Sequence, residues 1–225
     1  MSLEVRRAGS RFVTLEAGRE TRHSFSFGPH YDPANLGFGL LVSHNDDRLA
    51  PGAGYPEHPH QEIEVVTWVL TGALAHRDST GGAGVLRPGQ VQVMSAGTGV
   101  VHSEYAEPGT GPTRFVQTWV RPAAWGEAPA YASADVSPGA GWTAVVGGDG
   151  LPVRAPGATL WITDASAGDQ LVVPEVPHAH LFVATGAARL GEVELAEGDA
   201  VRMSDRGGDL TVTAPGQLML WTFGP

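Results

Sequence analysis

The chain of 225 residues contains no cysteine and no lysine. Without cysteine it forms no disulfide bonds and no thiolate metal site, so any bound metal must be held by histidine and carboxylate side chains. All 14 basic residues are arginines, and the 24 acidic residues give a net charge of -10. This acidic balance argues against direct binding to nucleic acid, which needs a basic surface to displace counterions.

Long hydrophobic runs are also missing. Residues 1–18 lack the apolar core of a signal peptide, and nowhere does the chain keep the run of about 18 apolar residues that a membrane helix requires. We therefore expect a soluble cytoplasmic protein with no membrane partner.

What the chain has instead is turn residues between short strands. The 31 glycines and 17 prolines separate short runs rich in valine, threonine and aromatic residues. No long stretch keeps the 3.6-residue apolar period of a helix. The pattern predicts an all-β fold.

One stretch of alternating polar residues marks the candidate site. His58, His60, Glu62 and Glu64 stand at two-residue intervals, directly before the β-branched and aromatic run 65–70. In a single β-strand these side chains share one face, and the apolar run carries that face into a core. Inward imidazoles need partners for their ring nitrogens. A metal ion supplies such a partner.

A second segment repeats this alternation about forty residues later. His102 and Glu104 share a face, and they follow a turn that contains Gly97 and Gly99. A single inward histidine is usually a core residue, but two such pairs favour metal ligands. Three imidazoles and one carboxylate from two strands suffice for one divalent ion. The spacing leaves open which glutamate completes the set.

The remaining histidines lack this support. We expect His76, beside Arg77 and a glycine-rich loop, to be solvated. His178 and His180 form a second pair at two-residue spacing, but in the register of the internal repeat described below they replace Glu64 and Val66 and find no acidic or histidine partner. We expect the others to be structural or exposed: His23, His30 and His44.

The second half of the chain repeats the first. Residues 69–73 (VLTGA) match 183–187 (VATGA), and residues 89–95 (GQVQVMS) match 198–204 (GDAVRMS). Such a repeat predicts two related β-barrels.

The segment 121–142, rich in proline, alanine and glycine, is predicted to be the linker. It separates an N-terminal metal-binding barrel (1–120) from a C-terminal barrel (143–225). In the register of the repeat, the ligand positions fall on Val172, Pro174, Thr211 and Thr213. We therefore expect no metal in the C-terminal barrel.

These residues resemble a known family. The pattern from Gly52 through His58 and His60 to Glu64 is similar to the first cupin motif, and Gly97 to His102 to the second. The strings HSFSF, YDP, GFG, NDD, HPH and SAGTGVVHSEY resemble the pirin family, specifically its bacterial quercetinase-like branch. The likeness is dense between residues 23 and 120.

The resemblance implies a bicupin, in which two antiparallel jelly-roll barrels are related by an internal repeat and only the first holds a metal. A general cupin takes Glu64 as the carboxylate ligand, whereas the pirin pattern takes Glu104. We follow the pirin pattern, with His58, His60, His102 and Glu104 as ligands and Fe(II) as the expected ion. Mn, Co, Ni and Zn accept the same ligands. Glu62 and Glu64 become candidates for the outer shell or the pocket mouth.

The function that the resemblance implies is a quercetin 2,3-dioxygenase-like activity on a small aromatic substrate and O2, with Glu104 as the base. Aromatic and apolar residues are candidates to flank a flat substrate: Phe25, Phe27, Phe38, Val66, Trp68 and Trp119. The alternative is a metal- or redox-dependent regulatory protein of the pirin type that acts through protein partners. A reachable metal site favours the enzyme, and a sealed site favours the regulator. A third option, a cupin isomerase or another small-molecule dioxygenase, requires a polar and narrow pocket.

Overall fold

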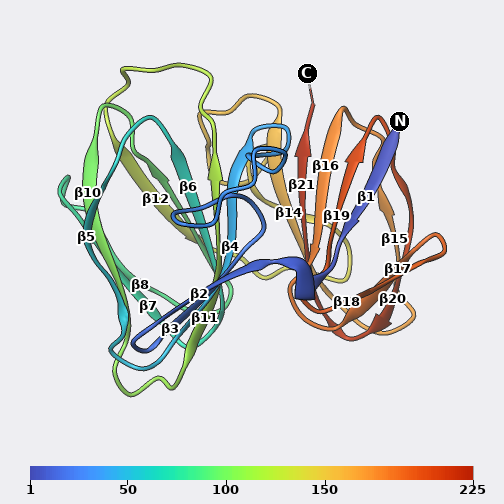
Figure 1. Cartoon of the computed structure of the whole chain (residues 1–225), viewed down its shortest axis with the longest axis horizontal. Helices are drawn as coiled ribbons and strands as arrows, with labels where there is room; N and C mark the ends of the chain where they lie inside the picture. Colours follow the sequence, from blue (N-terminus) through green and yellow to red (C-terminus); the bar gives the residue numbers. More distant parts are fainter. Residues whose placement is uncertain (225) are drawn as a thin grey trace. The chain divides into compact units, whose positions relative to one another are not determined.

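The structure is a computed structural model and describes residues 1–224. Its regular elements are β-strands and one short 3-10 turn, η1 (Ala8–Ser10), so the predicted all-β class is confirmed. Within these residues no helix is long and apolar enough to cross a membrane. The chain divides into two compact units, each made of two antiparallel sheets (Figure 1).

The first unit, called here the N-terminal unit, comprises residues 12–136 and 151–155. Its larger sheet has the strand order β12-β9-β6-β11-β4-β3-β2, and its smaller sheet has the order β5-β10-β7-β8. The larger sheet is built from β2 (Phe12–Glu16), β3 (Arg19–His23), β4 (Leu41–Leu49), β6 (Glu64–Thr71), β9 (Gln90–Ser95), β11 (Thr113–Val120) and β12 (Ala130–Asp135). The smaller sheet is built from β5 (Gly54–His60), β7 (Leu74–Asp78), β8 (Ala83–Leu86) and β10 (Val100–Ala106).

The second unit, called here the C-terminal unit, comprises residues 1–11, 137–150 and the chain from Pro156 onward. Its sheets have the orders β1-β19-β16-β21-β14-β13 and β15-β20-β17-β18. The larger sheet is built from β1 (Ser2–Arg6), β13 (Thr143–Val146), β14 (Ala158–Ala165), β16 (His178–Val183), β19 (Ala200–Ser204) and β21 (Gly216–Phe223). The smaller sheet is built from β15 (Gln170–Val173), β17 (Ala187–Leu190), β18 (Val193–Ala196) and β20 (Gly208–Ala214).

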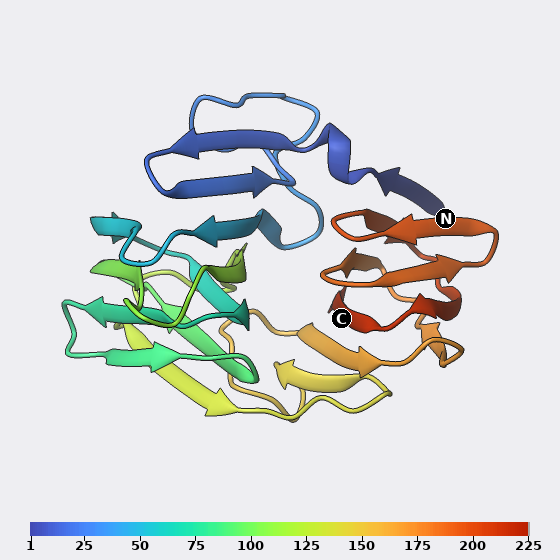
Figure 2. The same ribbon diagram turned by 90° about the horizontal axis from the view of Figure 1, so that it is seen from below.

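The predicted internal repeat is visible in the sheet topology. The strands β9-β6-β11-β4 of the N-terminal unit correspond to β19-β16-β21-β14, and β5-β10-β7-β8 correspond to β15-β20-β17-β18 (Figure 2). The repeat register proposed for the ligand positions differs from the structure, because Val172 is 61% exposed and faces outward. The inward side chains on β15 and β20 are aliphatic and belong to the core of this unit: Leu171, Val173, Leu210 and Val212.

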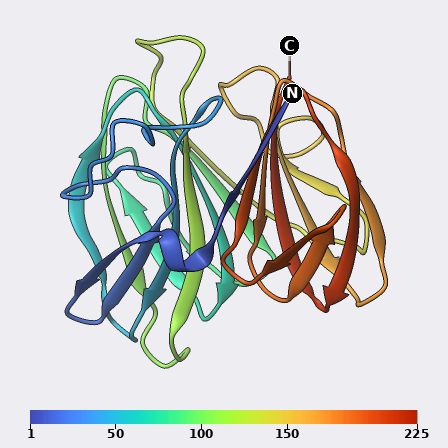
Figure 3. The same cartoon turned by 45° about the vertical axis from the view of Figure 1, so that its right-hand side comes forward.

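The unit boundaries also differ from those expected from composition. Strand β1, at the start of the predicted N-terminal barrel, pairs with β19 of the C-terminal unit (Figure 3). The predicted linker 121–142 contains β12, which pairs with β9. The two strands occupy equivalent edges of the two larger sheets. Edge strands contribute few side chains to the core, so a search of the sequence for apolar runs does not identify them as strands.

The stretch from His58 to Leu70 is not the single strand that its alternation suggested. The chain leaves β5 after His60 and enters β6, in the other sheet, at Glu64. Between them Glu62 takes a left-handed conformation with a φ of 52°, and its N–H donates to the carbonyl oxygen of Gly97. The histidines therefore lie on one sheet and the apolar run on the other.

Candidate metal centre

Three imidazoles meet on the inner face of the smaller sheet of the N-terminal unit. Strands β5 and β10 are antiparallel neighbours with His102 opposite His58, and strand alternation turns His60 to the same face. The ring centroids lie 4.4 Å apart for His58 and His102, and 4.9 Å apart for each of the other two pairs. One donor nitrogen from each ring lies within 4.8 Å of the others.

The hydrogen bonding of these rings leaves nitrogen lone pairs available. Nδ1 of His58 lies 2.7 Å from the carbonyl oxygen of Pro56, so its N–H donates there and Nε2 keeps the lone pair. Nε2 of His60 and Nε2 of His102 are buried and have no hydrogen-bond partner within residues 1–224. Burial, with the nearby histidines, lowers the pKa of His60 to about 4 and that of His102 to about 2. Three converging imidazoles, each with a ring nitrogen available as a donor, fit a divalent metal.

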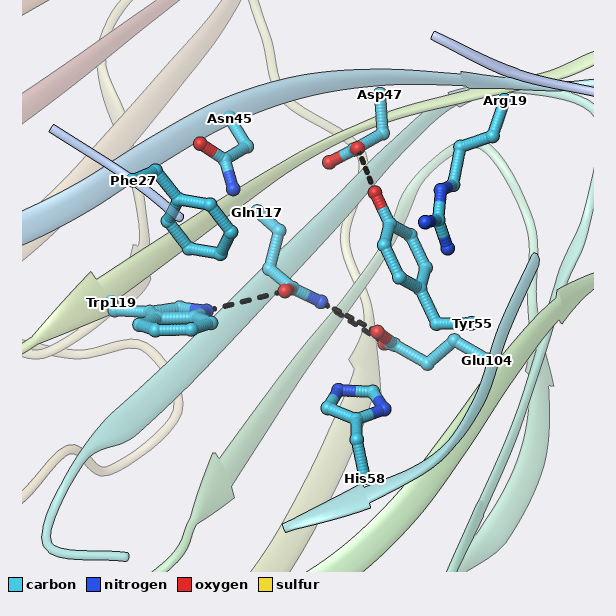
Figure 4. A pocket seen from close by; sticks show the side chains of 9 residues that line it. All are labelled: Arg19, Phe27, Asn45, Asp47, Tyr55, His58, Glu104, Gln117 and Trp119. Carbon is cyan, nitrogen blue, oxygen red and sulfur yellow. Dashed lines mark hydrogen bonds between the residues drawn. The ribbon is translucent and has the colours of Figure 1, made fainter. Parts of the chain in front are cut away.

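Glu104 is the next inward side chain of β10 and is 1% exposed. Nε2 of Gln117, on β11, donates to its two carboxylate oxygens at 3.1 and 2.8 Å. The Oε1 atom of Gln117 accepts from the indole N–H of Trp119 at 3.2 Å (Figure 4). Burial raises the pKa of Glu104 to about 7, while the Gln117 hydrogen bonds lower it. The carboxylate is thus oriented by a neighbouring strand.

A cavity of about 260 Å³ opens beside His58 and Glu104. Trp119 and Phe27 form an aromatic side of this pocket, and their rings pack edge to face at 5.2 Å. The polar part of the lining is formed by Arg19, Asn45, Asp47, Tyr55 and Gln117 (Figure 4). Of the six residues expected to flank a substrate, only these two aromatics line the pocket.

Tyr55 and Asp47 form a second polar pair in the lining. The Tyr55 hydroxyl and the Thr21 hydroxyl both donate to Oδ1 of Asp47 at 2.5 Å. Burial raises the pKa of Asp47 to about 6, although both hydrogen bonds lower it. Nothing in the spacing of the sequence brings β4 and β5 together, so this pair emerges only from the fold.

His76 is not the solvated residue that the sequence suggested, because it is 3% exposed. It belongs to β7, which pairs with β10 and places His76 opposite Glu104. A second group of donor atoms within 4.8 Å of one another consists of His76, His102 and Glu104. The sequence did carry a clue: His76 and Asp78 alternate as His58 and His60 do.

Glu62 and Glu64, expected near the site, instead accept hydrogen bonds from other segments of the N-terminal unit. Oε2 of Glu64 accepts from the Ser95 hydroxyl at 2.7 Å and from the backbone N–H of Arg154 at 3.2 Å. Glu62 accepts from the N–H of Gly126 at 2.9 Å. Neither glutamate lines the pocket, and among residues 1–224 neither belongs to a group of donors close enough to share a metal.

Comparison with known sequences gives consistent matches. The family model described as Pirin matches residues 4–120. A Mycobacterium tuberculosis protein named "Putative quercetin 2,3-dioxygenase" is 44% identical over 234 aligned residues, which cover 98% of this chain and 94% of that protein. A Caulobacter vibrioides protein named "Pirin-like protein" is 35% identical over 205 residues, 87% of each chain.

Two solved structures share the fold. A bacterial pirin from Escherichia coli, crystallised in complex with nickel(II), superposes with a TM-score of 0.92, at 27% identity and with full coverage of both chains. A quercetin 2,3-dioxygenase from Acinetobacter baumannii gives a TM-score of 0.80 at 22% identity, covering 95% of this chain and 84% of that one. The second likeness concerns the fold alone.

Proposed function

Since this chain belongs to the pirin family, we propose that it is a metal-dependent dioxygenase of the quercetin 2,3-dioxygenase type. Its substrate is a flavonol or a related enolisable aromatic compound, and O2 is the second substrate. The observation that supports this proposal is the convergence of three imidazoles and a buried carboxylate beside a pocket with an aromatic side. Relatives named as quercetin 2,3-dioxygenases support the same reaction class.

In this proposal His58, His60, His102 and Glu104 hold one divalent ion, Fe(II) in the first instance. Nickel(II) is present in the structure of the Escherichia coli pirin, and Mn, Co and Zn also suit these donors. When bound, the ion supplies a positive charge that favours the anionic form of the substrate and open coordination positions for oxygen chemistry.

The protein side chains have three tasks. Glu104 removes the proton of the substrate 3-hydroxyl group, and Gln117 keeps both carboxylate oxygens directed for that transfer. Trp119 and Phe27 contact the flat face of the ring. O2 then adds to C2 and C4 of the deprotonated ring, and its O–O bond breaks together with the two C–C bonds to C3. C3 leaves as carbon monoxide, and the proton returns from Glu104 to the carboxylate of the ester product.

Access to the site supports the enzyme over the regulatory alternative. His58 is only half-buried, and it shares the cavity of about 260 Å³ with Glu104. A site of this kind admits a small molecule from outside.

The test is anaerobic loading of the full chain with Fe(II), followed by addition of quercetin and O2. We expect metal-dependent loss of the flavonol with one carbon monoxide released for each molecule consumed. A fully loaded protein that leaves the flavonol intact, or consumes it without carbon monoxide, contradicts the proposal.

A further inference from the structure

Three buried polar side chains are in contact one after another: Asp78 with His76, and His76 with the proposed ligand His102. This series is called the positioning chain. Nε2 of His76 lies 3.1 Å from Oδ2 of Asp78, and Nδ1 of His76 lies 3.4 Å from Nδ1 of His102. These three side chains are 8% exposed or less. Resting on the proposed metal site, we propose that His76 and Asp78 are positioning residues that keep His102 in the tautomer whose Nε2 binds the ion.

The direction of each hydrogen bond in this chain follows from its first member. Oδ1 of Asp78 accepts from the backbone N–H of Thr80 at 2.8 Å, from its hydroxyl at 2.7 Å and from the N–H of Gly82 at 3.0 Å. A carboxylate only accepts, so Nε2–H of His76 donates to Oδ2.

The direction of the hydrogen bond between His76 and His102 depends on whether Nδ1 of His76 donates or accepts. The side-chain amide nitrogen of Gln92, which can only donate, faces this atom at 3.4 Å, so Nδ1 is an acceptor. The N–H on Nδ1 of His102 therefore points at His76. The lone pair of His102 is left on Nε2, which is buried and has no hydrogen-bond partner among residues 1–224, in a ring whose centroid lies 4.4 Å from that of His58 and 4.9 Å from that of His60.

Gly82 and Tyr131 pack closely against the Asp78 and His76 side chains. A Cβ on Gly82 would overlap Oδ2 of Asp78, so the loop after β7 needs glycine for the carboxylate to reach His76. On the other side Tyr131 of β12 stacks on the His76 ring, with centroids 4.9 Å apart and planes 21° from parallel. Partners that orient metal-binding histidines in this way raise affinity and fix the ring.

Asp78→Asn tests the first residue of the positioning chain. Because Oδ1 accepts three hydrogen bonds, the new amide nitrogen occupies the place of Oδ2 and donates to His76. His76 then donates from Nδ1, and His102 must carry its proton on Nε2, where the metal binds. We expect metal affinity to fall by about 10- to 100-fold. His76→Phe keeps the ring stacked on Tyr131 but removes both nitrogens, and we expect a loss of the same order.

The experiment is a Ni(II) titration against a competing chelator, made on the metal-free full chain. The proteins are the wild type, Asp78→Asn, His76→Phe and the double variant, with thermal unfolding of each metal-free form as the measure of folding. Asp169→Asn is the matched control, because Asp169 caps the N–H of Ser166 in the C-terminal unit. We expect wild-type affinity in the control. The double variant should lose no more affinity than His76→Phe alone, because Asp78 acts only through His76.

Unchanged Ni(II) affinity in both single variants overturns the inference, as does a double variant whose loss is the product of the single losses. If Asp78→Asn does not fold, His76→Phe decides alone. A wild-type chain that binds no Ni(II) overturns the proposed metal site itself, which separates that failure from a failure of the positioning chain.

Discussion

Gln117 holds Glu104 by both carboxylate oxygens, at 3.1 and 2.8 Å, from a neighbouring sheet. The same amide accepts from Trp119, which forms the aromatic side of the pocket. The group proposed to take the substrate proton and the ring proposed to contact the substrate are therefore fixed by one side chain. A displacement of Gln117 changes both at once.

Gln117→Leu should lower turnover of the metal-loaded protein by about 10- to 100-fold, the usual effect of losing an orienting partner. Ni(II) stoichiometry should remain at one per chain, because the three imidazoles are untouched. The measurement is steady-state turnover beside metal content. Gln170→Leu, which removes hydrogen bonds to Thr211 and Gly168 in the C-terminal unit, serves as the control. Unaltered turnover in Gln117→Leu would show that Glu104 needs no orientation.

His58→Ala and His102→Ala should each abolish metal binding and turnover. The circular dichroism of both variants should stay that of the wild type, because the large buried side chains, such as Trp68 and Phe115, are untouched. His178→Ala, on β16 of the other unit, should keep full occupancy. Elemental analysis after dialysis checks these outcomes, and full occupancy in His58→Ala would refute the ligand assignment.

Asp47 should make the metal-free protein less stable as the pH rises. Its folded pKa of about 6 lies above the ordinary value of 3.8, so between pH 3.8 and pH 6 the folded state binds more protons than the unfolded state. The stabilisation is complete below pH 3.8 and is lost as the pH passes through about 6. Between pH 4 and pH 7 the free energy of unfolding should fall by about 2 kcal/mol more in the wild type than in Asp47→Asn. Urea denaturation of both proteins at a series of pH values measures this difference. An equal change in the free energy of unfolding with pH in the two proteins would contradict the raised pKa of Asp47.

Metal removal should lower thermal stability reversibly. An ion at 100 times its Kd adds about 2.7 kcal/mol to the free energy of unfolding, which for a chain of this size corresponds to roughly 5 to 10 °C in Tm. Calorimetry with and without a chelator measures the shift. His58→Ala should show no difference between the two conditions, and a chelator shift in that variant would place the ion elsewhere.

Much of this molecule could be predicted from the sequence. Short strands between glycines predicted the all-β class, matched segments such as 69–73 and 183–187 predicted two related barrels, and the structural and family comparisons confirm a bicupin of the pirin family. The alternation of His58, His60 and His102 survives in the structure because two-residue spacing survives in any extended strand.

Other features depend on contacts that no local pattern encodes. The turn at Glu62 divides what reads as one strand, because its backbone N–H is bound by a residue on a distant loop. His76 is buried only because β7 pairs with β10 and Tyr131 covers it. None of the residues of the edge strands β1 and β12 is fully buried, so composition assigns these strands to a barrel start and a linker.

The most direct test of the account is a crystal structure of the Ni(II)-loaded chain with anomalous diffraction recorded at the nickel edge. The account predicts one peak per chain, bounded by Nε2 of His58, His60 and His102 and by a carboxylate oxygen of Glu104. A peak held by Glu64, a peak between His76 and Glu104, or a peak in the C-terminal unit would contradict it.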